Sequence, residues 1–155
     1  MSGVQIWTVE TPRFQMDVSV FGQGERAFVI FPGISVEPVS RSAVAVAASY
    51  RAFGKDYTVY VFDRVRDFGE GYTVQAMARD TAEAMARLGI RGADALGTSQ
   101  GGMILQCLAR EHPELIRRGV LGSTAARMEP KGTALMRSWK ELALAGDTQG
   151  LNRAM

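Results

Sequence analysis

Cysteine and histidine are nearly absent from this chain of 155 residues, since each occurs once. The single cysteine, Cys107, has no partner for an internal disulfide, which is typical of proteins in the reducing cytosol. The single histidine, His112, excludes a histidine-rich metal site, and no cluster of cysteine and histidine indicates zinc. We therefore expect a cytoplasmic protein that uses neither a metal ion nor a cofactor.

The sequence also lacks a long apolar run and a strong excess of charge. No stretch approaches the ~18 apolar residues that a membrane span needs, and residues 1–5 lack the basic and apolar regions of a signal peptide. The formal net charge is +2 and the basic residues are scattered, which argues against nucleic acid as a partner. The length is suited to one domain with its own core.

Apolar runs alternate with helical patterns along the chain. Residues 4–9 and 14–21 read as a pair of strands, and the second alternates apolar with polar side chains as an antiparallel hairpin does. Further strands are predicted at 27–31, 57–62, 93–96 and 119–122, and helices at 40–52, 73–88, 101–111 and from 131 onward. This order predicts an α/β fold with a mostly parallel sheet, helices on both of its faces, and the hairpin at one edge.

Two details of this pattern bear on the packing. The buried stripe of the helix at 101–111 is predicted to consist of Met103, Ile104, Cys107 and Leu108, so that Cys107 is a core residue rather than a reactive thiol. The basic pair at 117–118 is predicted to lie in the turn before the strand at 119–122.

A serine flanked by glycines lies between the strand at 93–96 and the helix at 101–111. Gly97, Ser99 and Gly101 form the pattern G-x-S-x-G, which turns a strand sharply into a helix and exposes the serine hydroxyl at the corner. Side chains at the two glycine positions would collide across so tight a turn. Many glycine-rich turns instead bind phosphate, but this one lacks the lysine of one such motif and the glycine spacing of the other. We predict that Ser99 is a catalytic nucleophile.

Attack by a serine on a carbonyl creates an oxyanion, which needs two backbone N–H donors. One donor follows the nucleophile directly, at Gln100, where the dipole of the helix N-terminus also favours negative charge. The second is expected in the loop after the strand at 27–31, which begins Pro32-Gly33, and we assign it to the N–H of Ile34. The alternative for this loop is an ordinary Pro-Gly turn.

The elbow, the Pro-Gly loop and the order of elements resemble the N-terminal half of an α/β-hydrolase, the superfamily of serine esterases, lipases and lactonases. The stretch 111–121 resembles the helix-to-strand passage that follows the elbow in that family. By this resemblance, residues 1–126 form the N-terminal part of the hydrolase core and residues 127–155 the start of a helical cap. It implies a hydrolase that acts on a small ester, lactone or related acyl substrate.

The same resemblance implies a triad in the chain order serine, acid, histidine, and this chain stops before the family's acid and histidine positions. His112 follows Ser99 by thirteen residues across a helix, roughly 20 Å away, so it does not replace the missing histidine. Asp63 is better explained as an organiser of its own loop, and Glu129 has no histidine to orient. We expect a C-terminally truncated hydrolase that is weakly active or inactive by itself.

Two other interpretations stay open, namely a non-catalytic binding or scaffold module that keeps the fold, and a fragment completed by strands of another chain. Trp139 either lines an acyl pocket or anchors a helix of the cap. Because nothing in the sequence pairs with the outer side of the strand at 119–122, we also expect self-association through that sheet edge.

Overall fold

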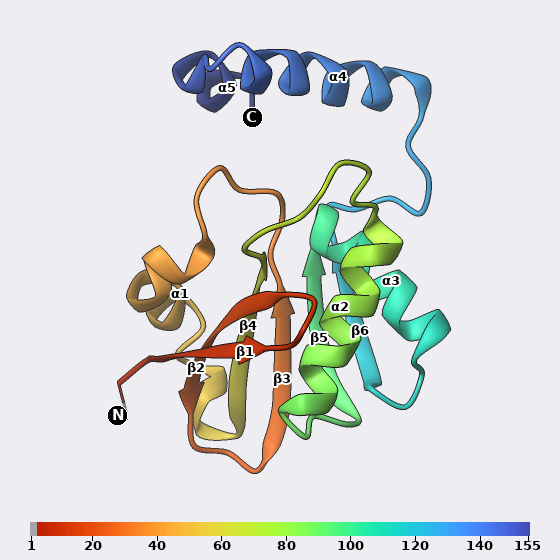
Figure 1. The fold of residues 1–155 in the computed structure, drawn as a ribbon. Coiled ribbons are helices and arrows are strands. Elements are labelled where there is room, and N and C mark those ends of the chain that lie inside the picture. The colour runs from red at the N-terminus through yellow and green to blue at the C-terminus, as the bar shows by residue number, and fades with distance from the viewer. Residues whose placement is uncertain (1–2) are drawn as a thin grey trace. The chain divides into compact units, whose positions relative to one another are not determined.

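The computed structural model describes residues 3–155, which form two compact units, one ending at Thr124 and one spanning Ala125–Met155. The first unit is built on a six-stranded sheet with the strand order β1-β2-β4-β3-β5-β6 (Figure 1). Its strands are β1 (Gln5–Glu10), β2 (Gln15–Gly22), β3 (Arg26–Phe31), β4 (Tyr57–Val65), β5 (Ala93–Thr98) and β6 (Ile116–Gly122). The β1–β2 and β2–β4 pairs are antiparallel and the other three pairs are parallel. The predicted α/β class, with a mostly parallel sheet and a hairpin at one edge, is confirmed.

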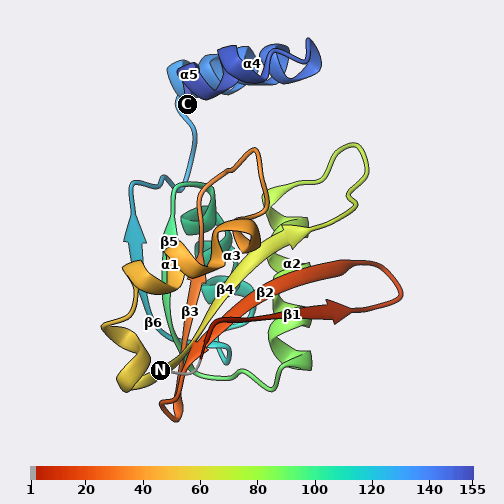
Figure 2. The same cartoon turned by 90° about the vertical axis from the view of Figure 1, so that its left-hand side faces the viewer.

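Helices cover both faces of this sheet (Figure 2). On one face lies α1 (Ala43–Ser49), which follows a short 3-10 turn, η1 (Val39–Ser42). The opposite face carries α2 (Val74–Arg87) and α3 (Gln100–Glu111).

The sheet consequently separates two apolar clusters, and β3 contributes to both. Val29 and Phe31 belong to the cluster beneath α2 and α3, whereas Phe28 and Ile30 belong to the cluster on the α1 side. Successive side chains of a strand point to opposite faces, so a strand covered on both faces must be apolar throughout. This explains the unbroken apolar run of β3 and places its carboxyl end, next to that of β5, in the middle of the sheet.

Three element boundaries differ from the sequence prediction. The helix predicted at 40–52 is shorter, because η1 precedes α1 and a second 3-10 turn, η2 (Phe53–Lys55), follows it. The strand predicted at 57–62 continues to Val65, because β2 pairs with β4 as far as that residue. The last strand begins at Ile116, where it meets the first residue of β5, so the arginines at 117–118 lie within the strand and not in a turn before it.

The buried stripe of α3 is also rotated from the predicted one. Ile104, Leu105 and Leu108 are buried, whereas Met103 and Cys107 are only half-buried. The stripe therefore faces the sheet through a residue, Leu105, that the helical pattern did not select. Burial raises the pKa of the Cys107 thiol, which makes it less reactive at neutral pH.

The second unit consists of α4 (Pro130–Leu144) and α5 (Thr148–Ala154). The indole Nε1–H of Trp139 donates a hydrogen bond to the carbonyl of Ala154 at 3.1 Å, which ties α4 to α5. Of the two roles considered for Trp139, this contact favours the anchoring of a helix. Within residues 3–155, no helix combines the length and the apolar character that a membrane crossing demands.

Candidate active site

Ser99 occupies the turn between β5 and α3 in a backbone conformation that serine rarely adopts. Its φ is 51° and its ψ is −120°, and it is the N-cap residue of α3. A non-glycine residue in this region costs about 1–3 kcal/mol and persists only where its surroundings hold it. The side chain is exposed, and its hydroxyl neither caps the helix nor bonds any other residue among those described.

Hydrogen bonds to its main chain hold Ser99 in this conformation. Its N–H donates to the carbonyl of Gly122 at 3.0 Å. Its own carbonyl accepts from the N–H of Gly102 at 3.0 Å and from the Thr124 hydroxyl at 2.6 Å. The strained turn is therefore held by Gly122, the last residue of β6, and by Thr124, which follows it by two positions. The sequence pattern indicated neither contact.

The glycines of the elbow are required by contact with neighbouring backbone. A Cβ atom on Gly97 would lie 2.6 Å from the carbonyl oxygen of Gly101, and one on Gly101 would lie 1.9 Å from the carbonyl oxygen of Phe31. A Cβ on Gly102 would lie 2.5 Å from Cβ of Thr124. Contacts below about 3 Å are not tolerated, so the glycine after the motif is as necessary as the two within it.

The loop after β3 reaches the serine through Gly33. A Cβ placed on Gly33 would lie 3.3 Å from Cβ and 3.8 Å from Oγ of Ser99. Within the part of the chain that the structure describes, the N–H groups of Ile34 and Gln100 donate to no acceptor. The structure thus brings the Pro-Gly loop against Ser99, and within the described residues both predicted donors are unused. Their convergence on one oxyanion stays a prediction.

Two neighbouring residues near the end of β4 organise this loop, and the sequence analysis assigned neither role correctly. The buried carboxylate of Asp63 accepts from the N–H groups of Val39 at 2.6 Å and Ser40 at 2.9 Å. Asp63 therefore lies within a strand and fixes the far end of the β3–α1 connection, not a loop of its own. The half-buried Arg64 donates from Nε to Oε1 of Gln100 at 3.1 Å and from Nη2 to the carbonyl of Pro32 at 2.7 Å.

A cavity of about 760 Å³ lies beside these groups, within the first unit. Gly33, Ile34 and Gln100 line it on the side of the elbow, and Arg64 and Tyr72 line it elsewhere. A volume of this size is suited to a small organic molecule. The two residues predicted to supply the donors, Ile34 and Gln100, therefore border this space.

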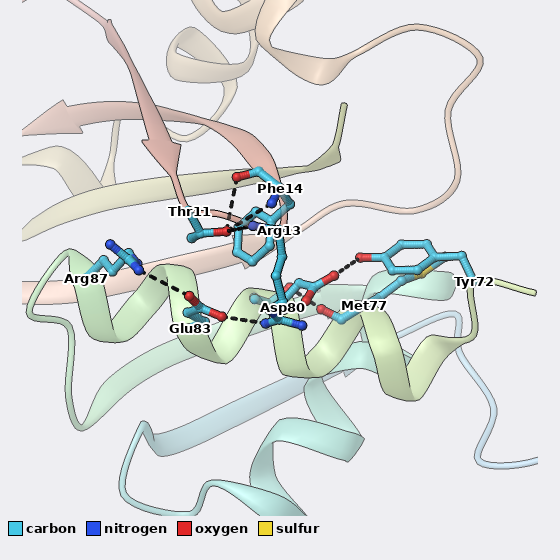
Figure 3. A network of polar contacts seen from close by, with 9 residues as sticks. Thr11, Arg13, Phe14, Tyr72, Met77, Asp80, Glu83 and Arg87 are labelled. Carbon is cyan, nitrogen blue, oxygen red and sulfur yellow. Dashed lines mark hydrogen bonds and ion pairs between the residues drawn. The ribbon is translucent and has the colours of Figure 1, made fainter. Parts of the chain in front are cut away.

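The Tyr72 wall of the cavity is fixed by a polar network (Figure 3). The Tyr72 hydroxyl donates to Asp80 of α2 at 2.7 Å, and Asp80 also pairs with Arg13 at 3.2 Å. Arg13 bonds Glu83 one turn further along α2. Burial and the hydrogen bond to Asp80 raise the pKa of Tyr72, so the phenol stays protonated at neutral pH. This network therefore stabilises the wall of the cavity at Tyr72.

Of the other candidates in the sequence analysis, His112 lies away from Ser99. His112 is the C-cap of α3, at the opposite end of a helix of 12 residues, which spans about 18 Å. Its Nδ1 lies 3.6 Å from a carboxylate oxygen of Glu114. Glu129 is the N-cap of α4 in the second unit. Residues 3–155 contain no group of three or more potential metal ligands.

Comparison with known proteins gives a consistent family. The model of the family described as "alpha/beta hydrolase fold" matches residues 31–151. Among solved structures, a hydrolase from Pseudomonas aeruginosa PA01 is 23% identical with a TM-score of 0.72, over 91% of this chain and 52% of that one.

Two further solved structures are similar in fold. Est816, described as an N-acyl homoserine lactone degrading enzyme, is 20% identical with a TM-score of 0.68, over 84% of this chain and 52% of its own. The epoxide hydrolase CorEH is 15% identical with a TM-score of 0.70, over 88% of this chain and 50% of its own. The chain thus spans about half the length of these solved chains, and at such identities the likeness shows the fold.

Proposed function

The chain belongs to the alpha/beta hydrolase family, and we propose that it carries the nucleophile half of a serine hydrolase acting on a small ester, lactone or related acyl compound. One observation carries this proposal. Among the described residues, Ser99 is held at φ 51° with an exposed hydroxyl that bonds nothing, and the N–H groups of Ile34 and Gln100 donate to no acceptor. The strain has no structural purpose that we can identify, and strained residues of this kind cluster at reacting centres.

In the proposed reaction, Oγ of Ser99 attacks the carbonyl carbon of the substrate. The carbonyl oxygen becomes an oxyanion, which accepts hydrogen bonds from the N–H groups of Gln100 and Ile34. When this intermediate collapses, the bond from the carbonyl carbon to the alkoxide breaks, the acyl group stays on Oγ, and the alkoxide takes up a proton and leaves as the alcohol. The N-terminal dipole of α3 adds to this stabilisation. The proton of Oγ needs a base, and the one histidine of the chain lies at the far end of α3. We propose that the acid and the histidine are not among these residues.

An isolated serine hydroxyl is a weak nucleophile. Loss of triad members lowers the rate by about 10⁴–10⁶, and the oxyanion site and binding supply what remains. We therefore expect slow, stoichiometric acylation of this chain rather than rapid turnover. As part of the same proposal we assign it to the cytosol, where a free Cys107 thiol is stable.

A fluorophosphonate probe followed by peptide mass spectrometry tests the proposal. Slow labelling is expected at Ser99, and Ser99→Ala should abolish it. Ser123→Ala is the matched control, because Ser123 is also exposed and has a φ of 46° but begins no helix. Labelling that is absent from Ser99, or spread equally over Ser123, would overturn the proposal. Ester turnover near ~10 s⁻¹ would instead show that a base within this chain had been missed.

A further inference from the structure

Arg64 connects the two halves of the proposed oxyanion site. Its Nε donates to the side chain of Gln100, whose backbone supplies one predicted donor. Its Nη2 donates to the carbonyl of Pro32, two residues before Ile34, whose backbone supplies the other predicted donor. The three segments come from β4, the β3–α1 loop and α3, and the residues are 32 and 36 positions apart in the chain.

The shape of the guanidinium suits this connection. Its N–H groups point outward in one rigid plane, so two bonds from the same group fix both the distance and the angle between the acceptors. A lysine ammonium carries a single nitrogen and cannot reproduce this spacing. One side chain therefore bonds both the loop and the elbow.

The charge of Arg64 has no ion-pair partner within reach. Both of its hydrogen-bond acceptors are neutral, and within residues 3–155 no carboxylate lies within 4.0 Å of its guanidinium. The carboxylate of Asp63 is nearby, but its oxygens accept the N–H groups of Val39 and Ser40. Burial lowers the pKa of Arg64, although the charge of Asp63 acts in the opposite direction, so holding this cation in place has a cost. A charged group kept at such a cost is more common at functional sites than elsewhere.

We propose that Arg64 is a positioning residue that holds the N–H groups of Ile34 and Gln100 at the spacing that one oxyanion requires. The inference rests on the proposed function of Ser99. It predicts that loss of the guanidinium moves the donors without removing either of them. A displacement of about 1 Å in such a site costs about 100-fold in rate, so a reduction of about 10–100-fold in the acylation of Ser99 is expected.

Two measurements on the full chain test this inference together, namely the rate of fluorophosphonate labelling of Ser99 and the ¹⁵N order parameters of Gly33 and Ile34. Arg64→Met should slow labelling about 10–100-fold and lower the order parameters from about 0.85 toward 0.6. Arg64→Lys should give intermediate values. Arg87→Met is the matched control, because Arg87 is an exposed arginine of α2 that pairs with Glu83, and both readouts should keep their wild-type values.

A double substitution isolates the bond between the two side chains. Gln100→Met keeps the backbone N–H but removes the acceptor of Arg64, so it should slow labelling less than Arg64→Met does. The double variant should be about as slow as Arg64→Met alone, because both changes remove the same bond. Fully additive effects would contradict a shared role. If Arg64→Met does not fold, Arg64→Lys and Gln100→Met answer the same question.

The outcomes separate this inference from the proposed function. Labelling of Ser99 in the wild type at a rate that Arg64→Met leaves unchanged overturns the role of Arg64 alone. Slower labelling with unchanged order parameters at Gly33 and Ile34 also overturns it, because the effect would then be electrostatic and not positional. Absence of labelling in the wild type overturns the proposed function, and the positioning role with it.

Discussion

The two ends of β5 hold polar groups in opposite ways. Near its start, the buried carboxylate of Asp94 accepts from Tyr57 at 2.8 Å, from Arg117 at 2.6 Å and from Arg118 at 3.1 and 3.2 Å. Just after its end, the hydroxyl of Ser99 bonds nothing among the described residues, and the nearby Arg64 has neutral partners only.

This difference separates a structural end of β5 from the end that carries the proposed site, called here the functional end. The charge of Asp94 is satisfied by three side chains, so nothing is left for a ligand, and the cluster ties β4, β5 and β6 together. At the other end, Ser99 has a strained backbone, and Ile34, Arg64 and Gln100 line a cavity. Among the described residues no carboxylate lies within 4.0 Å of the Arg64 guanidinium, so this end keeps polar groups that a ligand could engage.

The largest effect on stability is expected when a methyl group is added to Gly101, beside Ser99 at the functional end of β5. In Gly101→Ala the new Cβ would lie 1.9 Å from the carbonyl of Phe31, so β3 and α3 must separate. We expect a loss of about 3 kcal/mol in the free energy of unfolding, measured by urea titration. Gly69→Ala, where no atom lies within 4 Å, should change it by less than about 0.5 kcal/mol. Similar losses in the two variants would mean that the elbow is not tightly packed.

A smaller effect on stability is expected from a substitution of Asp94, at the structural end of β5. Asp94→Asn leaves Arg117 and Arg118 without an anionic partner and should cost about 2 kcal/mol of unfolding free energy. The fluorophosphonate labelling of Ser99 should keep its wild-type rate, because Asp94 lies at the opposite end of the strand. A large loss of labelling in a folded Asp94→Asn protein would break the comparison between the two ends.

The same variant should change the response to acid. Burial acts to raise the pKa of Asp94, but the hydrogen bonds from Arg118, Tyr57 and Arg117 outweigh it and lower the pKa to about 2. A depressed carboxyl pKa stabilises the fold above the unfolded value of about 4, and that stability is lost as the pH falls from about 5 toward 2. Urea titrations across this range should show a shallower decline for Asp94→Asn than for the wild type.

A finer test concerns the support that Ser99 receives from Thr124, two residues after the end of β6. Thr124→Val keeps the shape of the side chain but removes the 2.6 Å hydrogen bond to the carbonyl of Ser99. We expect a loss of about 1 kcal/mol, together with slower labelling of Ser99. Thr133→Val removes a comparable hydroxyl-to-carbonyl bond in α4, and should leave the labelling rate as it is. Unchanged labelling in Thr124→Val would show that the strained turn does not need this bond.

The smallest effect is expected on self-association, through β6, the edge strand that pairs with β5. Val120 and Leu121 are 61% and 50% exposed there, and we expect weak self-association through this edge at micromolar concentrations. Val120→Lys should shift sedimentation toward the monomer. Ile6→Lys makes the same change on β1, the edge at the other side of the sheet, and should leave the association unaltered. A wild-type chain that sediments as a monomer contradicts this expectation.

Much of the fold was predictable because it depends on local patterns. The apolar run of β3 follows from its period, and the requirement for glycine at 97 follows from contact with Gly101 and Gly102 across the turn. The requirement at Gly101 has a different origin from the predicted one, because the obstructing atoms belong to Phe31 and Pro32. Leu105 was missed because helical spacing locates a stripe only to within about one residue, and the neighbouring sheet decides which side is covered. The arginines at 117–118 were placed in a turn because charges in a strand are unusual without a buried partner.

The sequence by itself determined the order of the elements and the position of the tight turn at Ser99, since both follow from patterns of residues close in the chain. Only the tertiary structure decided that Arg64 spans the elbow and the loop, and that Asp94 gathers Tyr57 and two arginines. These partners lie 23 to 37 residues apart in the chain. Which of them meet depends on the strand order β4-β3-β5-β6, because parallel strands bring together residues that no local pattern connects.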